Sequence, residues 1–286
     1  MEELGASLLF NLEWRINVGK LRRILLTTAT LIVTIFITTG CSVNKDSDDF
    51  TFMKDKNISK IAIQSMRDKT YKFTVTDKGV INSIYKILSK AKEVNSRSDL
   101  DADYLFEIYE GPDKVYKFNY ITGLDRRDGG NFYSEDKNYI VSKRLDNDII
   151  KNFWNIRKPI DFQRVYYDSI LQALDLYIKE SKKETKIGVN IEDDLEMSKF
   201  ILSTDLVDFK KRLSKFSSVQ LIEKDKEKDF DITMSIVTEG YTSDKYKAVV
   251  TFKGKAGEND VKYYIYDKYN KGEWDIQILK EKPEDF

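Results

Sequence analysis

Residues 101–121 read DADYLFEIYEGPDKVYKFNYI, and this stretch carries the clearest short-range fold signal in the chain. From Tyr104 onward apolar and polar residues alternate, which is the pattern of a strand with one buried face. The segment EGPDK at 110–114 contains Gly and Pro and therefore predicts a turn. Because VYKFNYI at 115–121 follows as a second strand, the stretch predicts an antiparallel β-hairpin.

Further strands and two helices flank the hairpin. The strand pattern recurs in ISKIAI at 58–63, YKFTVT at 71–76 and NYIVS at 138–142. Asp77 precedes apolar residues at helical spacing and is predicted to cap a helix. LDNDIIKNFWNI at 145–156 predicts a second, amphipathic helix. This order of elements predicts a small α+β domain over residues 58–157.

The same region resembles a known family. The order of ISKIAI, DKGVINSIYKILSKAKEV, DADYLFEIYEGPDKVYKFNYI and DKNYIVS resembles the YhfM-like domain of Gram-positive lipoproteins over roughly residues 58–157. The resemblance implies an exported lipoprotein, and it supplies no catalytic or binding residues. This chain departs from the short single-domain members because it continues for well over a hundred residues.

A second α+β domain is predicted over residues 162–286, after a linker, RKPID, that contains Pro159. Its helical patterns cover 162–183 and 195–216, with a break at Ser203–Thr204, and IGVNI at 187–191 predicts a strand. Five strand patterns follow at 219–223, 230–239, 245–254, 261–269 and 273–280, which predicts an antiparallel meander. Helices followed by such a sheet, ending in a W-x-I-x-I strand, look like the cone of nuclear transport factor-like domains.

The N-terminal segment predicts export and anchoring. Residues 20–41, KLRRILLTTATLIVTIFITTGC, place basic residues before an uncharged apolar run, which is the order of a secretory signal. The end of the run resembles a bacterial lipobox, in which cleavage between Gly40 and Cys41 leaves a lipid-modified cysteine (diacylglyceryl, palmitate). We therefore expect a signal peptide at 1–40, a polar tether at 41–57 and a chain held in the lipid bilayer on the outer face of the cell membrane.

Two other interpretations of the apolar run stay open. About 20 apolar residues can span a bilayer, so the segment could remain as an uncleaved transmembrane anchor with the same topology. A buried helix is the third interpretation, although the run has no polar face. Residues 1–19 are longer than a typical n-region, which makes Val18 a candidate start.

The amino-acid composition limits which functions the chain can have. The 48 basic residues balance the 48 acidic ones, so no overall charge attracts nucleic acid, and none is expected as a partner. Histidine is absent and Cys41 is the single cysteine, which excludes an intrachain disulfide and the usual Ser-His or Cys-His nucleophile. We expect a non-enzymatic binding module for an envelope protein or polymer, without catalytic residues or cofactor. The alternatives are a carboxylate-dependent enzyme acting on a cell-envelope polymer and a solute-binding subunit of a transporter.

Weaker candidate sites follow from acidic and aromatic clusters. Asp99, Asp101 and Asp103 occupy positions 1, 3 and 5 of a calcium-loop pattern with Glu110 at position 12, but Tyr104 stands where the loop needs Gly. A solvated loop feeding a strand is the favoured interpretation of this segment. Alternation on the strand 261–269 places Tyr264 and Tyr266 on one face as a candidate ligand surface, with Tyr263 on the other.

Three more charged segments have simpler interpretations. IEDDLE at 191–196 could supply paired carboxylates, but acidic residues also favour a helix start. DRRDGGN at 125–131 could form an anion nest, and a surface turn is the favoured interpretation. Lys210, Lys211 and Arg212 match the negative end of a helix dipole.

Overall fold

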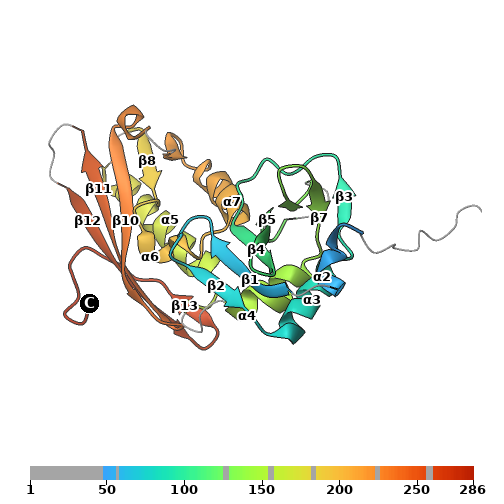
Figure 1. The fold of residues 1–286 in the computed structure, drawn as a ribbon. Helices are drawn as coiled ribbons and strands as arrows, with labels where there is room; N and C mark the ends of the chain where they lie inside the picture. Colours follow the sequence, from blue (N-terminus) through green and yellow to red (C-terminus); the bar gives the residue numbers. More distant parts are fainter. Residues whose placement is uncertain are drawn as a thin grey trace, which may run out of the picture. The chain divides into compact units, whose positions relative to one another are not determined.

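The computed structural model describes residues 48–55, 58–124, 129–153, 158–181, 185–222, 226–255 and 260–286. All of them belong to one compact unit, residues 46–286. The predicted signal peptide and lipid-modified Cys41 lie outside the described residues. The described chain is α+β and contains two sheets, an antiparallel N-terminal sheet and a curled, mixed C-terminal sheet (Figure 1).

The N-terminal sheet contains seven strands in the order β2-β1-β4-β5-β6-β7-β3. Every pair of neighbours is antiparallel. The strands are β1 (Ile58–Ser65), β2 (Lys72–Val75), β3 (Lys92–Val94), β4 (Tyr104–Glu110), β5 (Lys114–Tyr120), β6 (Phe132–Tyr133) and β7 (Asn138–Ile140). The predicted hairpin is confirmed as β4–β5, paired from Tyr104↔Tyr120 to Glu110↔Lys114. Gly111 closes its turn with φ of 65°, a value that favours glycine.

Helices cover one part of this sheet. The side chain of Asp77 accepts a hydrogen bond from the N–H of Val80, which confirms the predicted cap of α3 (Lys78–Leu88). The helix buries Ile81, Ile84, Ile87 and Leu88 in the same core as β1. The predicted helix at 145–156 begins as a π-helical turn, η2 (Leu145–Ile150), and continues as α4 (Lys151–Phe153).

Part of the predicted tether packs in the core. The short elements η1 (Asp48–Phe50) and α2 (Phe52–Asp55) precede β1. Phe50 is fully buried, and its ring lies 5.1 Å from that of Tyr139 between centroids. Phe52 stacks on Tyr116 at 3.8 Å. Residues 48–55 therefore contribute aromatic side chains to the folded region.

The C-terminal sheet contains seven strands, six of them in the order β13-β12-β11-β10-β8-β9, with β14 also paired to β12. The strands are β8 (Ile187–Asn190), β9 (Val219–Leu221), β10 (Ile232–Tyr241), β11 (Lys245–Gly254), β12 (Val261–Asn270), β13 (Glu273–Asp275) and β14 (Ile278–Leu279). The remaining elements are α5 (Phe162–Ser181), α6 (Leu195–Ser198), α7 (Ser203–Leu213) and η3 (Glu227–Asp229).

The expectation of an antiparallel C-terminal sheet is wrong at one edge. Strands β10, β11 and β12 form the predicted meander, but β8 lies between β9 and β10 and is parallel to both. All four residues of β8 are buried, as is typical of an interior parallel strand. A side chain at Gly188 would meet Phe230 at 2.6 Å, so only glycine fits there. The last predicted strand is divided into β13 and β14, and both pair with β12.

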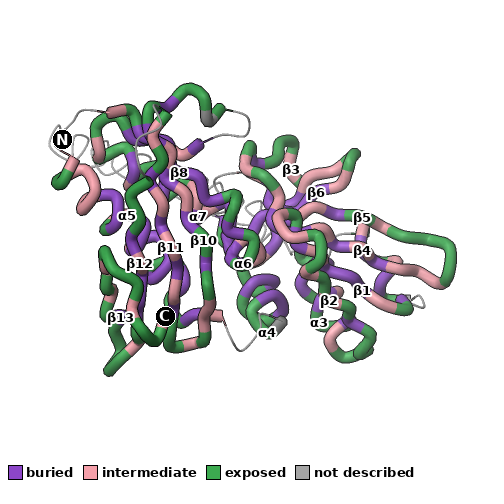
Figure 2. The backbone as a smooth tube through the Cα atoms, turned by 90° about the vertical axis from the view of Figure 1, so that its left-hand side faces the viewer, coloured by how far each residue is buried: buried purple, intermediate pink, exposed green. Residues whose placement is uncertain are grey.

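Helix α5 packs across the C-terminal sheet (Figure 1). Its Tyr166 ring lies 6.2 Å from that of Tyr246 on β11, and Tyr177 stacks on Phe252 at 3.9 Å. Figure 2 shows buried residues along α5 and on the strands of both sheets, with exposed residues at the turns. Within the described ranges, no helix has both the length and the apolar character needed to cross a membrane.

Candidate functional site

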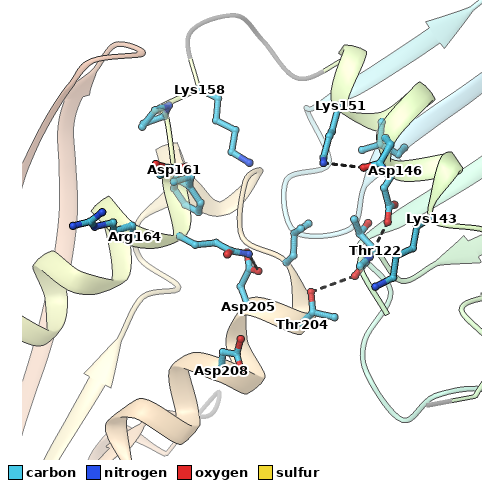
Figure 3. Close-up of a pocket in the computed structure, with 17 residues that line it drawn as sticks. Thr122, Lys143, Asp146, Lys151, Lys158, Asp161, Arg164, Thr204, Asp205 and Asp208 are labelled. Carbon is cyan, nitrogen blue, oxygen red and sulfur yellow. Dashed lines mark hydrogen bonds between the residues drawn. The ribbon is translucent and has the colours of Figure 1, made fainter. Parts of the chain in front are cut away.

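A cleft of about 920 Å³ opens beside the segment that joins the two sheets. Its N-terminal wall comes from the turn after β5 and from η2 and α4, and its C-terminal wall comes from the starts of α5 and α7 (Figure 3). Its lining includes Thr122, Lys143, Asp146, Ile150, Lys151, Lys158, Asp161, Phe162, Gln163, Arg164, Leu202, Thr204, Asp205 and Asp208.

Asp103 fixes the two walls to each other. Its buried carboxylate accepts hydrogen bonds from the N–H of Thr122 at 2.8 Å and from the N–H of Ser203 at 2.7 Å. Thr204 strengthens this link because its hydroxyl donates to the carbonyl oxygen of Thr122 at 3.2 Å. Helix α7 begins at Ser203, where the sequence predicted a break in a longer helix. This start of α7 is thus tied to the turn after β5. Burial raises the pKa of Asp103 to about 6, against the opposing effect of these bonds.

Arg67 supports the same link from the end of β1. Its guanidinium donates to the carbonyl oxygen of Ile201 at 3.1 Å and to the hydroxyl of Ser203 at 2.6 Å. It also lies 3.8 Å from the Asp103 carboxylate. A cation from the N-terminal sheet therefore holds the chain just before α7.

The N-terminal wall is basic at its rim. The side chains of Lys143 and Lys151 are exposed, and Lys151 donates to Asn147 at 2.8 Å (Figure 3). The buried Asp146 below them accepts hydrogen bonds from the Tyr120 hydroxyl and from the Gly123 N–H. Burial raises the pKa of Asp146, while its hydrogen bonds and the lysines nearby oppose the shift.

Lys158, which precedes α5, and Asp205 of α7 also line the cleft (Figure 3). The Lys158 ammonium lies 5.3 Å from the ring centroid of Phe162 and 5.6 Å from that of Phe200. Burial lowers the pKa of Lys158 to about 7, although the Asp205 charge opposes this shift. Burial likewise raises the pKa of Asp205 to about 6, and Gln163 donates a hydrogen bond to its carboxylate.

The joining segment that carries Lys158 is held by the C-terminal sheet. The indole N–H of Trp274 donates to the carbonyl oxygen of Ile160 at 2.7 Å. The N–H of Ile160 donates to the carbonyl oxygen of Ser243 at 2.9 Å. The position of Lys158 is therefore set by β13 and by the turn between β10 and β11.

Charged groups of opposite sign face each other across the opening. Asp205 and Asp208 lie on α7, opposite Lys143 and Lys151 (Figure 3). Asp208 is exposed, and its carboxylate makes no hydrogen bond or ion pair with any other described residue. The cleft therefore has a basic N-terminal wall and an acidic α7 wall.

Two buried hydroxyl groups add unused hydrogen-bonding capacity. A smaller hollow of about 310 Å³ continues along α7 and shares Gln163, Asp205 and Asp208 with the cleft. Tyr167 lines this hollow and is 2% exposed, and Thr122 lines the cleft itself. Among the described residues, neither hydroxyl has a hydrogen-bond partner, although buried hydroxyls are normally paired.

The calcium-pattern aspartates do not converge. Asp99 and Asp101 are exposed, while Asp103 points into the interior and binds backbone N–H groups. Glu110, at the far end of β4, accepts a hydrogen bond from Tyr116 and lies 3.4 Å from Lys114. In the described part of the chain, no group of three or more acidic, cysteine or histidine side chains is placed to hold a metal ion.

The predicted tyrosine surface is in contact with the end of the sequence. Tyr264 and Tyr266 lie on the face of β12 opposite the buried Tyr263. The ring of Phe286 lies 5.4 Å from that of Tyr264, and the Tyr266 hydroxyl donates to Asp285. This face is therefore occupied by residues 285 and 286 in the structure.

The other charged segments have structural roles where the structure describes them. Asp194 of the IEDDLE segment is buried and accepts hydrogen bonds from the N–H and hydroxyl of Thr238, which ties α6 to β10. Residues 125–128 lie outside the described residues. Lys210, Lys211 and Arg212 occupy the last turn of α7, and Arg212 pairs with Asp168 on α5.

Sequence reasoning did not single out Lys158, Asp205 or Asp208. A signal for the two aspartates exists, because they are three residues apart on a predicted helix and so share one face. No local pattern marks Lys158, whose surroundings are assembled from residues distant in the sequence.

Comparison with known proteins agrees with the resemblance seen in the sequence. Residues 54–159 match the family model described as YhfM protein. No curated protein and no solved structure matches the chain. The matched range contains the N-terminal sheet, the basic wall of the cleft and Lys158, whereas α5 and α7 lie beyond it. The chain thus carries a YhfM family domain at residues 54–159, followed by a second, C-terminal α+β region.

Proposed function

We propose that the protein is a lipid-anchored lipoprotein on the outer face of the cell membrane and that it binds a polar ligand in the cleft. The cleft carries this proposal, because charged and hydrogen-bonding groups from two parts of the fold converge on a space of about 920 Å³. That volume is of the order found for small-molecule sites, about 300–1,000 Å³. The Gly40–Cys41 lipobox pattern supports the anchor and the location.

The anchor is tested on the membrane fraction of cells that express the full chain. Mass spectrometry of the N-terminal peptide should find a diacylglyceryl group on Cys41, and Cys41→Ala should abolish it and release the chain from the membrane. An unmodified peptide that retains residues 24–40 would replace the lipid anchor with a transmembrane anchor. Binding in the cleft does not depend on which anchor is found.

Binding is tested with the purified full chain in detergent. Its thermal unfolding is followed with separate panels of amino acids, short peptides, sugar phosphates and neutral sugars. A ligand that binds only the folded state raises the unfolding temperature. At least one panel should do so, and Asp208→Asn or Lys151→Gln should reduce the shift. If no panel stabilises the chain, or if both variants respond as the unaltered chain does, the proposed site is refuted.

A carboxylate-dependent enzyme is the second candidate function. One observation favours it: the pKa of Asp205 is raised to about 6 and that of Lys158 is lowered to about 7 in the same cleft. Both values are suited to general acid–base chemistry near neutral pH. Release of soluble fragments from isolated envelope polymer by the unaltered chain, and its loss in Asp205→Asn, would favour this candidate over simple binding.

The fold supports a finer architectural proposal for the C-terminal region. We propose that its curled sheet, with α5 across one face and Trp274 near its end, forms a cone like that of nuclear transport factor-like domains. The parallel pairing of β8 with β9 and β10 is an addition to a simple meander. An experimental structure that superposes on such a cone would establish the relationship.

A further inference from the structure

We infer that the ligand of the cleft is a small zwitterion, which places its anionic group at Lys143 and Lys151 and its ammonium group at Asp205 and Asp208. This inference rests on the proposed function, because it names the class of molecule that the same cleft would bind. Each of the four side chains lines the cleft, and the two pairs lie on opposite walls (Figure 3).

Two exposed lysines make the basic wall suitable for binding an anion. Asp146, an acidic residue of the same wall, already accepts hydrogen bonds from Tyr120 and Gly123 and is buried. Lys143 and Lys151 are exposed, and among the described residues Lys151 donates to the neutral amide oxygen of Asn147 and to no carboxylate. Lysine acts as a compact point charge, so a carboxylate or a phosphate fits this wall equally well.

Two carboxylates make the α7 wall suitable for binding a cation. Asp205 and Asp208 are three residues apart on α7 and therefore share one face of the helix. Gln163, the side-chain donor to Asp205, is neutral. Asp208 has no side-chain partner among the described residues. An ammonium group with three donors could bind both carboxylates.

Independent support comes from the two unpaired hydroxyls. Thr122 lines the cleft and is 4% exposed, and no described residue bonds its side-chain oxygen. The Tyr167 hydroxyl, in the adjoining hollow, is likewise buried and has no hydrogen-bond partner among the described residues. Buried hydroxyls without partners are costly, so a polar ligand that reaches them would gain hydrogen bonds. The apolar side chains of Ile150, Phe162 and Leu202 complete the lining and suit the short body of such a molecule.

A zwitterion can be a peptide with free ends or a phosphate ester that carries an amine, and two probes distinguish these sources. Tri-alanine with free ends carries an ammonium and a carboxylate, and glycerophosphoethanolamine carries an ammonium and a phosphate. Each is compared with its single-charge relatives: N-acetyl-tri-alanine and tri-alanine amide for the peptide, and glycerol 3-phosphate and ethanolamine for the phosphate. Binding is measured by isothermal titration calorimetry on the full chain in detergent micelles.

At least one zwitterion should bind, and removal of either of its charges should weaken binding by about tenfold or more. Lys151→Gln and Asp208→Asn should each weaken binding of the zwitterion by about fivefold to tenfold. Asp208→Asn should leave binding of the ammonium-free analogue unchanged. The exposed Lys262 and Asp136 provide the matched controls Lys262→Gln and Asp136→Asn, which should have no effect. Thr122→Val should weaken binding of the zwitterion without lowering the unfolding temperature of the ligand-free chain.

The results separate this inference from the proposed function. If a single-charge analogue binds as tightly as its zwitterion, the zwitterion class is refuted while a ligand cleft remains. If neither zwitterion binds, the inference is also refuted, and the broader panel of solutes decides whether the cleft binds another class. If a zwitterion binds but no cleft variant alters its affinity, the assigned place of binding is wrong.

Discussion

The carboxylate of Asp103 accepts a hydrogen bond from the backbone N–H of Ser203 at 2.7 Å, across 100 residues of sequence. Its second oxygen accepts from the N–H of Thr122 at 2.8 Å. Asp103→Asn turns one acceptor into a donor that faces an N–H group, and should cost about 2–4 kcal/mol of unfolding free energy. Urea unfolding of the full chain in detergent measures this loss.

The neighbouring Asp101 supplies the control for this variant. It is exposed, so Asp101→Asn should change the unfolding free energy by less than about 0.5 kcal/mol. Equal effects of the two substitutions would contradict the structural role of Asp103. A loss confined to Asp103→Asn would show that this carboxylate links the N-terminal sheet to α7.

The pH dependence of stability should be governed partly by Asp267. This carboxylate is fully buried on β12, and burial raises its pKa to about 7, although Ser169 and Gln277 donate hydrogen bonds to it. The folded state therefore binds the proton more tightly than the unfolded state. The protonated Asp267 therefore contributes to the free energy of unfolding. This contribution is complete below about pH 4 and is lost as the pH rises to about 7, a change of up to about 4 kcal/mol.

Asp267→Asn isolates this contribution. The amide oxygen can still accept from the Gln277 N–H. The Ser169 hydroxyl can direct its single proton to the carbonyl oxygen of Val165 instead and accept from the new amide. The variant should lose less stability than the unaltered chain between about pH 4 and pH 8. Identical pH profiles in chemical denaturation would show that Asp267 does not titrate in this range.

Local elements of the fold follow from the sequence because their signals are local. The hairpin around Gly111 and the Asp77 cap depend on residues a few positions apart, and both are found as expected. The parallel β8–β9 pair was missed because α6 and α7 lie between these strands. Alternation indicates that a strand forms, but it does not specify which strand becomes its neighbour.

The candidate site was less predictable for the same physical reason. Asp103 stood out as a possible ligand of calcium, yet its carboxylate binds backbone groups at Thr122 and Ser203. The surroundings of Lys158 combine Phe162, Phe200 and Asp205, which no spacing in the sequence brings together. These surroundings exist only in the folded chain, in which residues distant in the sequence are brought together.

Residues 285 and 286 should protect the tyrosine face of β12. Phe286 contacts Tyr264 in an edge-on arrangement, with ring centroids 5.4 Å apart. Phe286→Ala should therefore increase the rate at which tetranitromethane nitrates Tyr264, because more of the ring becomes accessible. The buried Tyr263, which is 1% exposed, serves as the internal control and should not react faster. An unchanged nitration rate at Tyr264 would mean that residue 286 does not cover this face in solution.

Lys158 should be the lysine of the cleft that acylates most readily. Burial beside Phe162 lowers its pKa to about 7, so a large fraction of its amine is neutral and nucleophilic near neutral pH. Trace labelling with acetic anhydride at about pH 7 should modify Lys158 roughly tenfold or more faster than the exposed Lys262, as read by peptide mass spectrometry. Because the Asp205 charge raises the pKa of Lys158, Asp205→Asn should lower that pKa further and increase the labelling rate. A slower rate in this variant, or equal rates at Lys158 and Lys262 in the unaltered chain, would contradict the environment that the structure gives to this amine.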